Sequence, residues 1–319
     1  MRPSLAAALS LALALLLPLP LGALAEEART FELRYEASLE RVPAGAQAVD
    51  LWLPLAQDDA QQTIRALHID GGDGAEIVHD PRYGNAALHL RPNAPARVGV
   101  TYVVERRAER RSLAAAARAG SSDGAGFARW LGPDKLGGLT ATVRGYAAKA
   151  TAGRGTPAEK IRAIYDYVWD TMRYDKSGEG WGRGDIQWAC DFKRGNCTDF
   201  HTLFVGMARA AGIPARFEIG LPLPPARGQG EIAGYHCWAR FWLDGVGWIP
   251  IDVSEAKKHP DKKDFFFGGH DANRVQLTIG RDLRFPGMRG EINYFVKPYA
   301  EADGVAIPVA AKFSFRDLP

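Results

Sequence analysis

The sequence has little net charge and only three cysteines, and both facts narrow the class of protein. Its 319 residues include 40 lysines and arginines and 37 acidic residues, which gives a formal net charge of +3. Proteins that bind nucleic acid or anionic membrane surfaces usually concentrate a larger basic excess. No glycine-rich phosphate loop follows a predicted strand either. We therefore expect neither a nucleic-acid partner nor a bound nucleotide.

Long apolar runs are absent after residue 25, so no later segment is expected to cross a membrane. The first 25 residues are different. Arg2 precedes an apolar run at residues 5–17, prolines end the run, and a small-x-small site at residues 23–25 precedes Glu26. This order is typical of a cleaved signal peptide. We predict that residues 1–25 are removed and that the mature chain is exported, to the periplasm or out of the cell, with no integral membrane segment.

The small number of cysteines matters because an exported chain enters an oxidising compartment, where disulfides persist. The three are Cys190, Cys197 and Cys237. Since the number is odd, at least one of them stays free or pairs with another chain. This raises the chance that one thiol is kept for chemistry.

Alternating apolar and polar residues predict strands in the first third of the chain. The segments with this pattern are residues 31–39, 49–53, 63–69, 75–79, 87–90 and 98–104. Because no helical pattern lies between them, we predict a β-sandwich across residues 26–108. The basic, alanine-rich stretch that follows is predicted as a linker or helical segment across residues 109–155.

A second region begins with a strong helix signal. Thr156 and Glu159 have the spacing of a capping box around Pro157, and an apolar helical face follows. We predict one domain across residues 156–319. Within it, residues 177–185 contain too much glycine for regular structure and are predicted to form a mobile loop.

Cys197 lies at the predicted start of another helix. Gly195 and Asn196 lead into it, and its apolar stripe consists of Phe200, Leu203, Phe204, Met207 and Ala211. Unpaired amides and the positive dipole end at a helix N-terminus stabilise a thiolate, although Asp199 in the same turn opposes this effect. The alternative is that Cys197 is half of a disulfide, which is the usual role of an exported cysteine.

Residues 235–253 predict a β-hairpin. Alternation places one set of apolar residues on a common face, and this set comprises Cys237, Ala239, Phe241, Leu243, Ile249, Ile251 and Val253. With a three-residue loop, Asp252 then lies on the other face, opposite Trp238 and diagonal to His236, within reach of a His–carboxylate hydrogen bond. Three roles follow. Cys197 would attack a carbonyl, His236 would carry the proton, and Asp252 would orient the imidazole.

Three motifs occur in this order: Gly195-x-Cys197-x-Asp199, then His236-x-Trp238, then Gly247-Trp248-x-Pro250-x-Asp252. Together they resemble the transglutaminase-like superfamily of papain-like cysteine enzymes, in the bacterial exported form with an N-terminal β domain. The resemblance covers roughly residues 155–255. It implies an α+β core in which the cysteine helix packs on an antiparallel sheet, preceded by a β-sandwich, and it implies that Cys197, His236 and Asp252 are the triad.

The resemblance also implies a reaction. We expect a cysteine-dependent acyl-transfer enzyme that acts on peptide or amide bonds of a peptide or protein substrate through a thioester, and hydrolysis by a peptidase or amidase ranks first. The alternatives are a protein-glutamine amine transglutaminase and a non-catalytic envelope module that binds peptides or assists assembly. No cofactor is needed.

The oxyanion hole is expected to use the Cys197 backbone amide, because this amide lies at the helix start. Candidates for the second donor, or for a substrate groove, are Gln187, Trp188, Trp181 and Trp238. The alternative for the tryptophans is packing.

Two other uses of the cysteines remain open. Cys197 and His201 are four residues apart on one helix and resemble a zinc pair, but no C-x-x-C or H-x-x-x-H motif supports a metal site. A Cys190–Cys237 disulfide would leave Cys197 free, and the alternative is that both are buried free cysteines.

Overall fold

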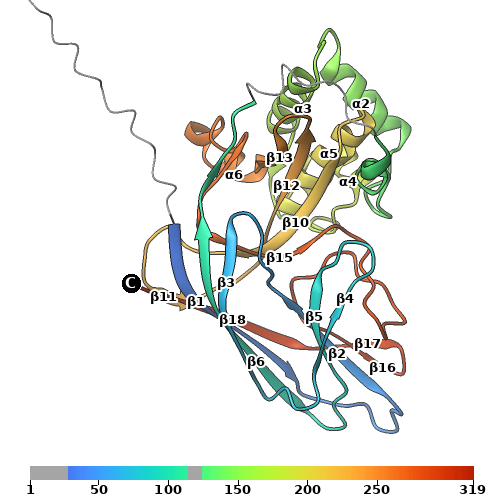
Figure 1. The fold of residues 1–319 in the computed structure, drawn as a ribbon. Helices are drawn as coiled ribbons and strands as arrows, with labels where there is room; N and C mark the ends of the chain where they lie inside the picture. The colour runs from blue at the N-terminus through green and yellow to red at the C-terminus, as the bar shows by residue number, and fades with distance from the viewer. Residues whose placement is uncertain (1–27, 114–123) are drawn as a thin grey trace, which may run out of the picture.

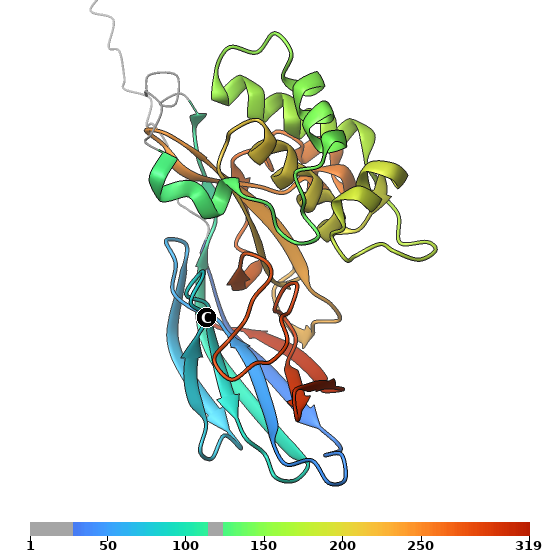
Figure 2. The same ribbon diagram turned by 90° about the vertical axis from the view of Figure 1, so that its right-hand side faces the viewer.

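Two five-stranded antiparallel sheets form the lower half of the molecule in the computed structural model, which describes residues 28–113 and 124–319 (Figures 1 and 2). The predicted signal peptide lies outside the described residues. The first six strands are β1 (Ala28–Leu39), β2 (Val49–Leu55), β3 (Gln62–Asp70), β4 (Glu76–His79), β5 (Ala86–Leu90) and β6 (Ala96–Arg107). Along β1 every second side chain is buried between the two sheets, as the alternating sequence predicts.

The end of the chain completes these two sheets. Strands β16 (Tyr299–Ala302), β17 (Val305–Ile307) and β18 (Ala310–Asp317) extend them, and β18 pairs with β1. In Figure 1 these red strands lie beside the blue N-terminal ones. The predicted boundary grouped residues 299–317 with the catalytic region, so the structure differs here. The physical reason is that β1 and β2 would otherwise leave edge backbone groups unpaired.

Further helices and short strands complete both halves of the molecule. They are β7 (Glu109–Arg110), η2 (Gly124–Phe127), α1 (Ala128–Leu131), α2 (Ala141–Thr151), β8 (Arg173–Tyr174), α4 (Ile186–Phe192), β9 (Arg194–Gly195), β11 (Gln229–Glu231), η3 (Pro260–Lys262) and β14 (Gly269–His270). Helix α3 (Pro157–Thr171) begins with the predicted capping box. The Thr156 hydroxyl accepts from the Glu159 amide at 3.2 Å, and the Glu159 carboxylate accepts from the Thr156 amide at 2.9 Å.

A four-stranded antiparallel sheet lies between the sandwich and the helices (Figure 2). Its order is β13 (Gly247–Ile251), β12 (His236–Leu243), β10 (Ala215–Pro222) and β15 (Arg274–Ile279). Helix α5 (Cys197–Ala210) covers one face, where Phe204 contacts Phe241 with ring centroids 6.3 Å apart. Helix α6 (Val253–Lys258) follows the β12–β13 hairpin. The core therefore consists of a cysteine helix packed on an antiparallel sheet, as the family resemblance implies.

The hairpin has the predicted register. Ala239 pairs with Ile251, and Phe241 pairs with Ile249. Asp252 comes directly after β13, so it lies at the level of Trp238 and close to His236. The register is thus the local reason that a histidine and an aspartate 16 residues apart meet.

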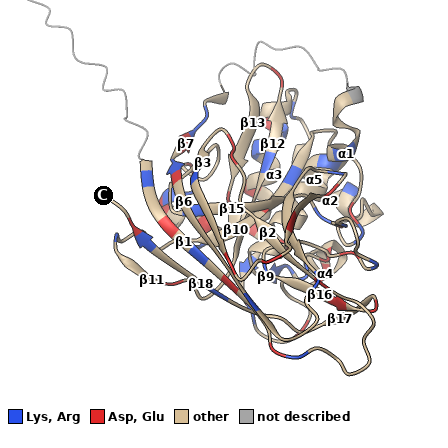
Figure 3. Ribbon diagram, turned by 60° about the horizontal axis from the view of Figure 1, so that its bottom comes forward, with Lys and Arg blue, Asp and Glu red and all other residues tan. Residues whose placement is uncertain are grey.

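Basic and acidic residues are interspersed along the ribbon in both halves (Figure 3), which agrees with the small net charge. In the described part of the chain, no helix has the length and the apolar composition needed to span a bilayer.

Candidate active site

Cys197 is the first residue of α5, and the preceding residues form a complete cap. The Asn196 side chain accepts from the Thr198 amide at 2.9 Å, and the Asp199 carboxylate accepts from the Asn196 amide at 3.0 Å. As a first-turn group, the Cys197 amide has no partner one turn earlier within the helix. The helix N-terminus therefore offers both a positive dipole end and an unused donor at the thiol.

Asp199 holds the glycine-rich loop against this helix start. Its carboxylate also accepts from the amides of Gly182 at 2.7 Å and Gly184 at 3.1 Å. Burial raises the pKa of Asp199 to about 6, while these backbone hydrogen bonds act in the opposite direction. The predicted mobile loop at residues 177–185 is therefore tied down at two amides.

Gly195 is the position in the motif where glycine is required. Its φ is +141°, and an added Cβ would overlap the Asp199 carboxylate. The Gly-x-Cys-x-Asp spacing thus has a steric cause, because the carboxylate that caps the helix occupies the space beside the glycine.

His236 and Asp252 form a buried pair. His236 Nε2 lies 2.7 Å from Asp252 Oδ2, and the Asp252 side chain is fully buried. Burial opposes the charged form of His236, but the attraction and hydrogen bond of Asp252 prevail and raise the pKa of His236 to about 10. The same attraction holds the pKa of Asp252 well below its usual value despite burial. The pair is therefore an imidazolium and a carboxylate at neutral pH.

The Cys197 thiol faces two partners. It is hydrogen-bonded to the Cys237 thiol and to the His236 ring, and these contacts lower the pKa of Cys197 well below its usual value, although burial opposes this. Since Nε2 of His236 faces Asp252, Nδ1 is the ring nitrogen left for Cys197. The arrangement favours a thiolate beside an imidazolium.

Cys237 does not form a disulfide with Cys190, one of the two possibilities that the sequence left open. All three cysteines are free and buried. Cys190 packs among the helices of the upper core, whereas the Cys237 thiol lies 3.7 Å from the Thr198 hydroxyl and contacts Cys197. The alternative of two buried free cysteines describes the structure, and burial raises the pKa of both thiols.

His201 connects the nucleophile helix to the segment that carries the aspartate. Its Nδ1 lies 2.8 Å from the Cys197 carbonyl oxygen, and its Nε2 lies 3.2 Å from the Val253 amide. The first nitrogen must therefore donate and the second accept, which fixes a neutral tautomer. Burial lowers the pKa of His201 in agreement. Both nitrogens are occupied, so neither is available to bind a metal.

The other sequence candidates have partners other than the thiol. Gln187 is exposed and its amide donates to Asp191 at 2.9 Å, the Trp181 indole N–H donates to the Gly178 carbonyl at 3.0 Å, and the Trp188 ring stacks on Phe192. Trp238 is fully buried and donates to Glu218 at 2.6 Å, so it cannot line a groove. In the described structure, none of these four forms a hydrogen bond with Cys197.

The sequence did not indicate several residues that surround the thiol. The Tyr235 hydroxyl lies 3.1 Å from the side-chain nitrogen Nδ2 of Asn196 and 3.2 Å from the Thr198 hydroxyl. These two residues flank Cys197 in the sequence. Tyr174 is within electrostatic range of Cys197, and burial raises its pKa. The predicted hairpin could have suggested Tyr235, because alternation places it on the same face as Cys237, but no local pattern indicates Tyr174.

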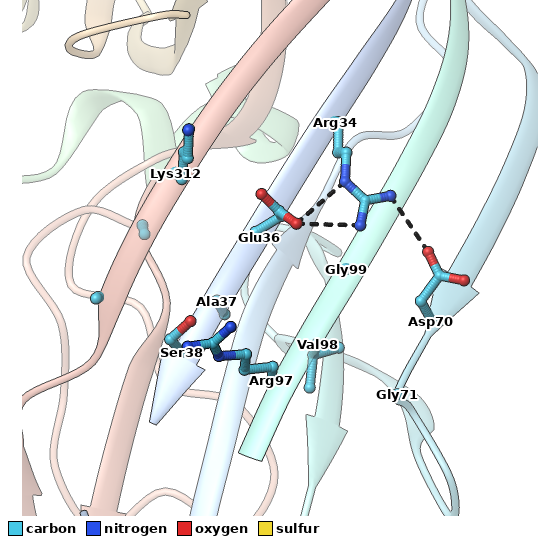
Figure 4. Close-up of a pocket in the computed structure, with 12 residues that line it drawn as sticks. Arg34, Glu36, Ala37, Ser38, Asp70, Gly71, Arg97, Val98, Gly99 and Lys312 are labelled. Carbon is cyan, nitrogen blue, oxygen red and sulfur yellow. Dashed lines mark hydrogen bonds and ion pairs between the residues drawn. The ribbon is translucent and has the colours of Figure 1, made fainter. Parts of the chain in front are cut away.

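A separate hollow of about 480 Å³ lies on the outer face of the sandwich (Figure 4). Arg34 in this hollow pairs with Glu36 at 3.0 Å and with Asp70 at 3.3 Å. The figure shows the arginine held between the two carboxylates, so its charge is compensated within the protein. No residue of the Cys197 site lines this hollow, and it is not part of the candidate active site.

Parts of this chain, including most of the candidate site, are similar in sequence to known proteins. Residues 144–253 match the model of the transglutaminase-like superfamily. An uncharacterized protein of Haemophilus influenzae is 28% identical over 311 residues, which cover 82% of this chain and 83% of that protein. The protein YebA of Bacillus subtilis is 24% identical over 136 residues, which cover 38% of this chain and 18% of YebA.

A solved structure from another organism has a similar fold. The crystal structure of a candidate cysteine protease from Cytophaga hutchinsonii superimposes with a TM-score of 0.60 at 16% identity and covers 92% of each chain. The periplasmic domain of TgpA from Pseudomonas aeruginosa gives a TM-score of only 0.38 at 16% identity, with 74% of this chain and 90% of that chain covered. The predicted fold class is confirmed: this is a mixed α/β protein with a β-rich N-terminal region, and residues 144–253 are similar to the transglutaminase-like superfamily.

Proposed function

We propose that the protein is a cysteine-dependent acyl-transfer enzyme that hydrolyses a peptide or amide bond. One observation carries the proposal: a buried line of hydrogen bonds runs from Cys197 through His236 to Asp252 at the N-terminus of α5. A thiol with a lowered pKa next to a histidine that a carboxylate orients is the arrangement used for nucleophilic attack on carbonyl carbon.

The proposed reaction has two halves. In the first, the Cys197 thiolate forms a bond to the carbonyl carbon, the carbonyl oxygen becomes an oxyanion, and the C–N bond breaks as the His236 imidazolium gives its proton to the departing amine. In the second, neutral His236 takes a proton from water, the resulting hydroxide attacks the thioester, and the thiolate leaves. The products are an amine and a carboxylic acid, and Asp252 holds the imidazole throughout.

The backbone amide of Cys197 is the first proposed hydrogen-bond donor to the oxyanion. It is a first-turn amide, and such donors cost no reorganisation during the reaction. We do not propose Gln187 as the second oxyanion donor, because its side-chain amide is bound to Asp191 at the surface.

The proposed setting is the periplasm or the cell exterior, where peptides and proteins of the cell envelope are the accessible substrates. The first 25 residues motivate this setting, since their sequence is typical of a signal peptide. Water or an amine can accept the acyl group from the thioester, and we propose water because nothing in the described site selects an amine.

The deciding experiment is trace alkylation of the mature protein with iodoacetamide from about pH 4 to about pH 9, mapped by mass spectrometry, with His236→Ala alongside. We expect selective labelling of Cys197 that persists at low pH and is lost in the variant. Cys190 is the internal control, because burial raises its pKa to about 11. Labelling of Cys197 with an ordinary thiol profile would contradict the proposal and favour a binding module. In a later substrate screen, an added primary amine tests for amide formation in place of hydrolysis.

A further inference from the structure

Arg274 is a buried arginine that reaches the candidate triad from a strand that the sequence motifs do not include. It is the first residue of β15 and is 3% exposed. Its Nη1 lies 3.2 Å from Asp252 Oδ2, the same oxygen that faces His236 Nε2 at 2.7 Å. The guanidinium also lies over the Trp238 ring, 4.9 Å from the centroid. Arg274 therefore holds Oδ2 of Asp252, the carboxylate oxygen that contacts the imidazole.

The other oxygen of Asp252 is held as well. Oδ1 accepts from the Glu255 amide and from the Ser254 hydroxyl, each at 3.0 Å. The start of α6 therefore fixes one oxygen and Arg274 fixes the other. Without Arg274, the carboxylate would keep only His236 on Oδ2 and could turn about its hydrogen bonds to α6.

The sandwich holds the strand that carries Arg274. β15 is the edge of its sheet, and two side-chain amides from the sandwich pair with its backbone. Gln62 donates to the Gln276 carbonyl at 3.0 Å and accepts from the Gln276 amide at 2.9 Å. Asn85 donates to the Ile279 carbonyl and accepts from the Ile279 amide, both at 2.8 Å. These pairs satisfy an edge that would otherwise be unpaired.

We propose that Arg274 is a positioning residue that holds the Asp252 carboxylate against His236. The sandwich in turn fixes Arg274, because Gln62 and Asn85 form hydrogen bonds with the backbone of β15. The inference deepens the proposed function and rests on it, because it assigns a role toward the His236 imidazole. It also gives the N-terminal sheets a part in the reaction that is separate from substrate binding.

Several titratable groups face the pair and contribute to its pH dependence. Helix α5 contributes Cys197 and His201, and α6 contributes Glu255, 4.0 Å from His236 Nε2, and Lys258. Tyr165 of α3, Cys237 of β12 and His270 of β14 are within electrostatic range of Asp252. Among the described cations, only His236 and Arg274 contact the Asp252 carboxylate at hydrogen-bond distance.

The sign of the effect follows from charge and geometry together. Arg274 is positive, so its removal raises the proton affinity of each neighbouring group. A carboxylate that is free to turn also holds the imidazolium less firmly beside Cys197, which weakens the stabilisation of the thiolate. Both changes move the pH midpoint of Cys197 alkylation upward.

The test compares alkylation midpoints of the unmodified mature protein with those of Arg274→Met, Arg274→Lys and Gln62→Met. We expect Arg274→Met to raise the midpoint by about one pH unit and to slow labelling near pH 5 about tenfold. Arg274→Lys keeps a cation and should recover most of the shift. Arg209→Met is the matched control, because this buried arginine pairs with Asp134 at 2.9 Å and does not contact the site. Its midpoint should stay at the unmodified value even if it unfolds more readily.

The outcomes separate the two proposals. An ordinary thiol midpoint in the unmodified protein would overturn the proposed function and this inference with it. A low midpoint that Arg274→Met leaves in place would overturn the positioning role alone. If circular dichroism shows that Arg274→Met does not fold, Gln62→Met decides: an upward shift supports the role of the sandwich-held strand, and an unchanged midpoint rejects it.

Discussion

At the residue scale, the chemistry of the site depends on a small number of buried groups that contact one another. Cys197 is 3% exposed and His236 is 6% exposed, so water screens their interaction only weakly. Each charge then depends on a specific neighbour: the imidazolium on Asp252, and the thiolate on the imidazolium and on the Cys237 thiol. Such a site responds sharply to single substitutions.

Cys237→Ala is expected to make Cys197 a more ordinary thiol. The hydrogen bond from the Cys237 thiol is the largest cause of the lowered pKa of Cys197, so its loss should raise that pKa and slow labelling near pH 5. Cys237→Ser keeps a hydroxyl donor and should remain closer to the unmodified rate. The measurement is the alkylation profile described above. An unchanged profile in Cys237→Ala would show that His236 alone sets the reactivity.

At the scale of elements, the loop of residues 177–185 shows how glycine positions and a helix start fit together. Gly182 and Gly184 donate to Asp199, and both have positive φ, +82° and +62°. A Cβ on Gly184 would meet the Thr198 side chain at 2.9 Å, in the first turn of α5. The loop is therefore closely packed against the helix that carries Cys197.

Gly184→Ala should destabilise the fold much more than Gly153→Ala. Both glycines have similar positive φ, +62° and +73°, but a Cβ on Gly153 meets nothing within 4 Å. The control should cost about 1 kcal/mol from backbone strain alone. Gly184→Ala should add about 2 kcal/mol for the collision with α5. Urea unfolding measures both values, and equal losses would mean that the loop gives way without strain.

At the scale of the whole molecule, the first and last strands join in one sheet. Arg29 on β1 is fully buried and forms two hydrogen bonds with the Asp317 carboxylate, at 2.7 and 2.8 Å. The same arginine donates to Asn273 at 2.6 Å, the residue before Arg274. The end of the sandwich and the start of β15 therefore share one buried cation.

Asp317→Ala is expected to destabilise the whole protein by about 3 kcal/mol, because it leaves the Arg29 guanidinium buried without its carboxylate. Arg316→Ala is the neighbouring control. Its ion pair with Glu32 at 3.1 Å is solvent-exposed and should contribute less than about 1 kcal/mol. Urea unfolding followed by both far-UV circular dichroism and tryptophan fluorescence should show one shifted transition. Loss of the sandwich signal alone would show that the two halves unfold independently.

The local parts of the architecture could be predicted because short-range patterns determine them. Helix α5 starts where a capping residue meets an apolar stripe, and the hairpin register follows from which residues of two adjacent strands are apolar. Those two patterns bring His236 and Asp252 together and place Cys197 at a helix start. The fold class followed from the same patterns and the family resemblance.

Tertiary structure alone decided the contacts that join distant segments. The last strand pairs with β1, and the Cys237 thiol contacts Cys197. Arg274 contacts Asp252. Each of these contacts joins residues that are far apart in sequence. Alternation places Cys237 on the apolar face of the hairpin, but it does not show which surface covers that face. Such pairings depend on closing long loops and on filling one particular volume, and both are properties of the packed chain rather than of any short segment.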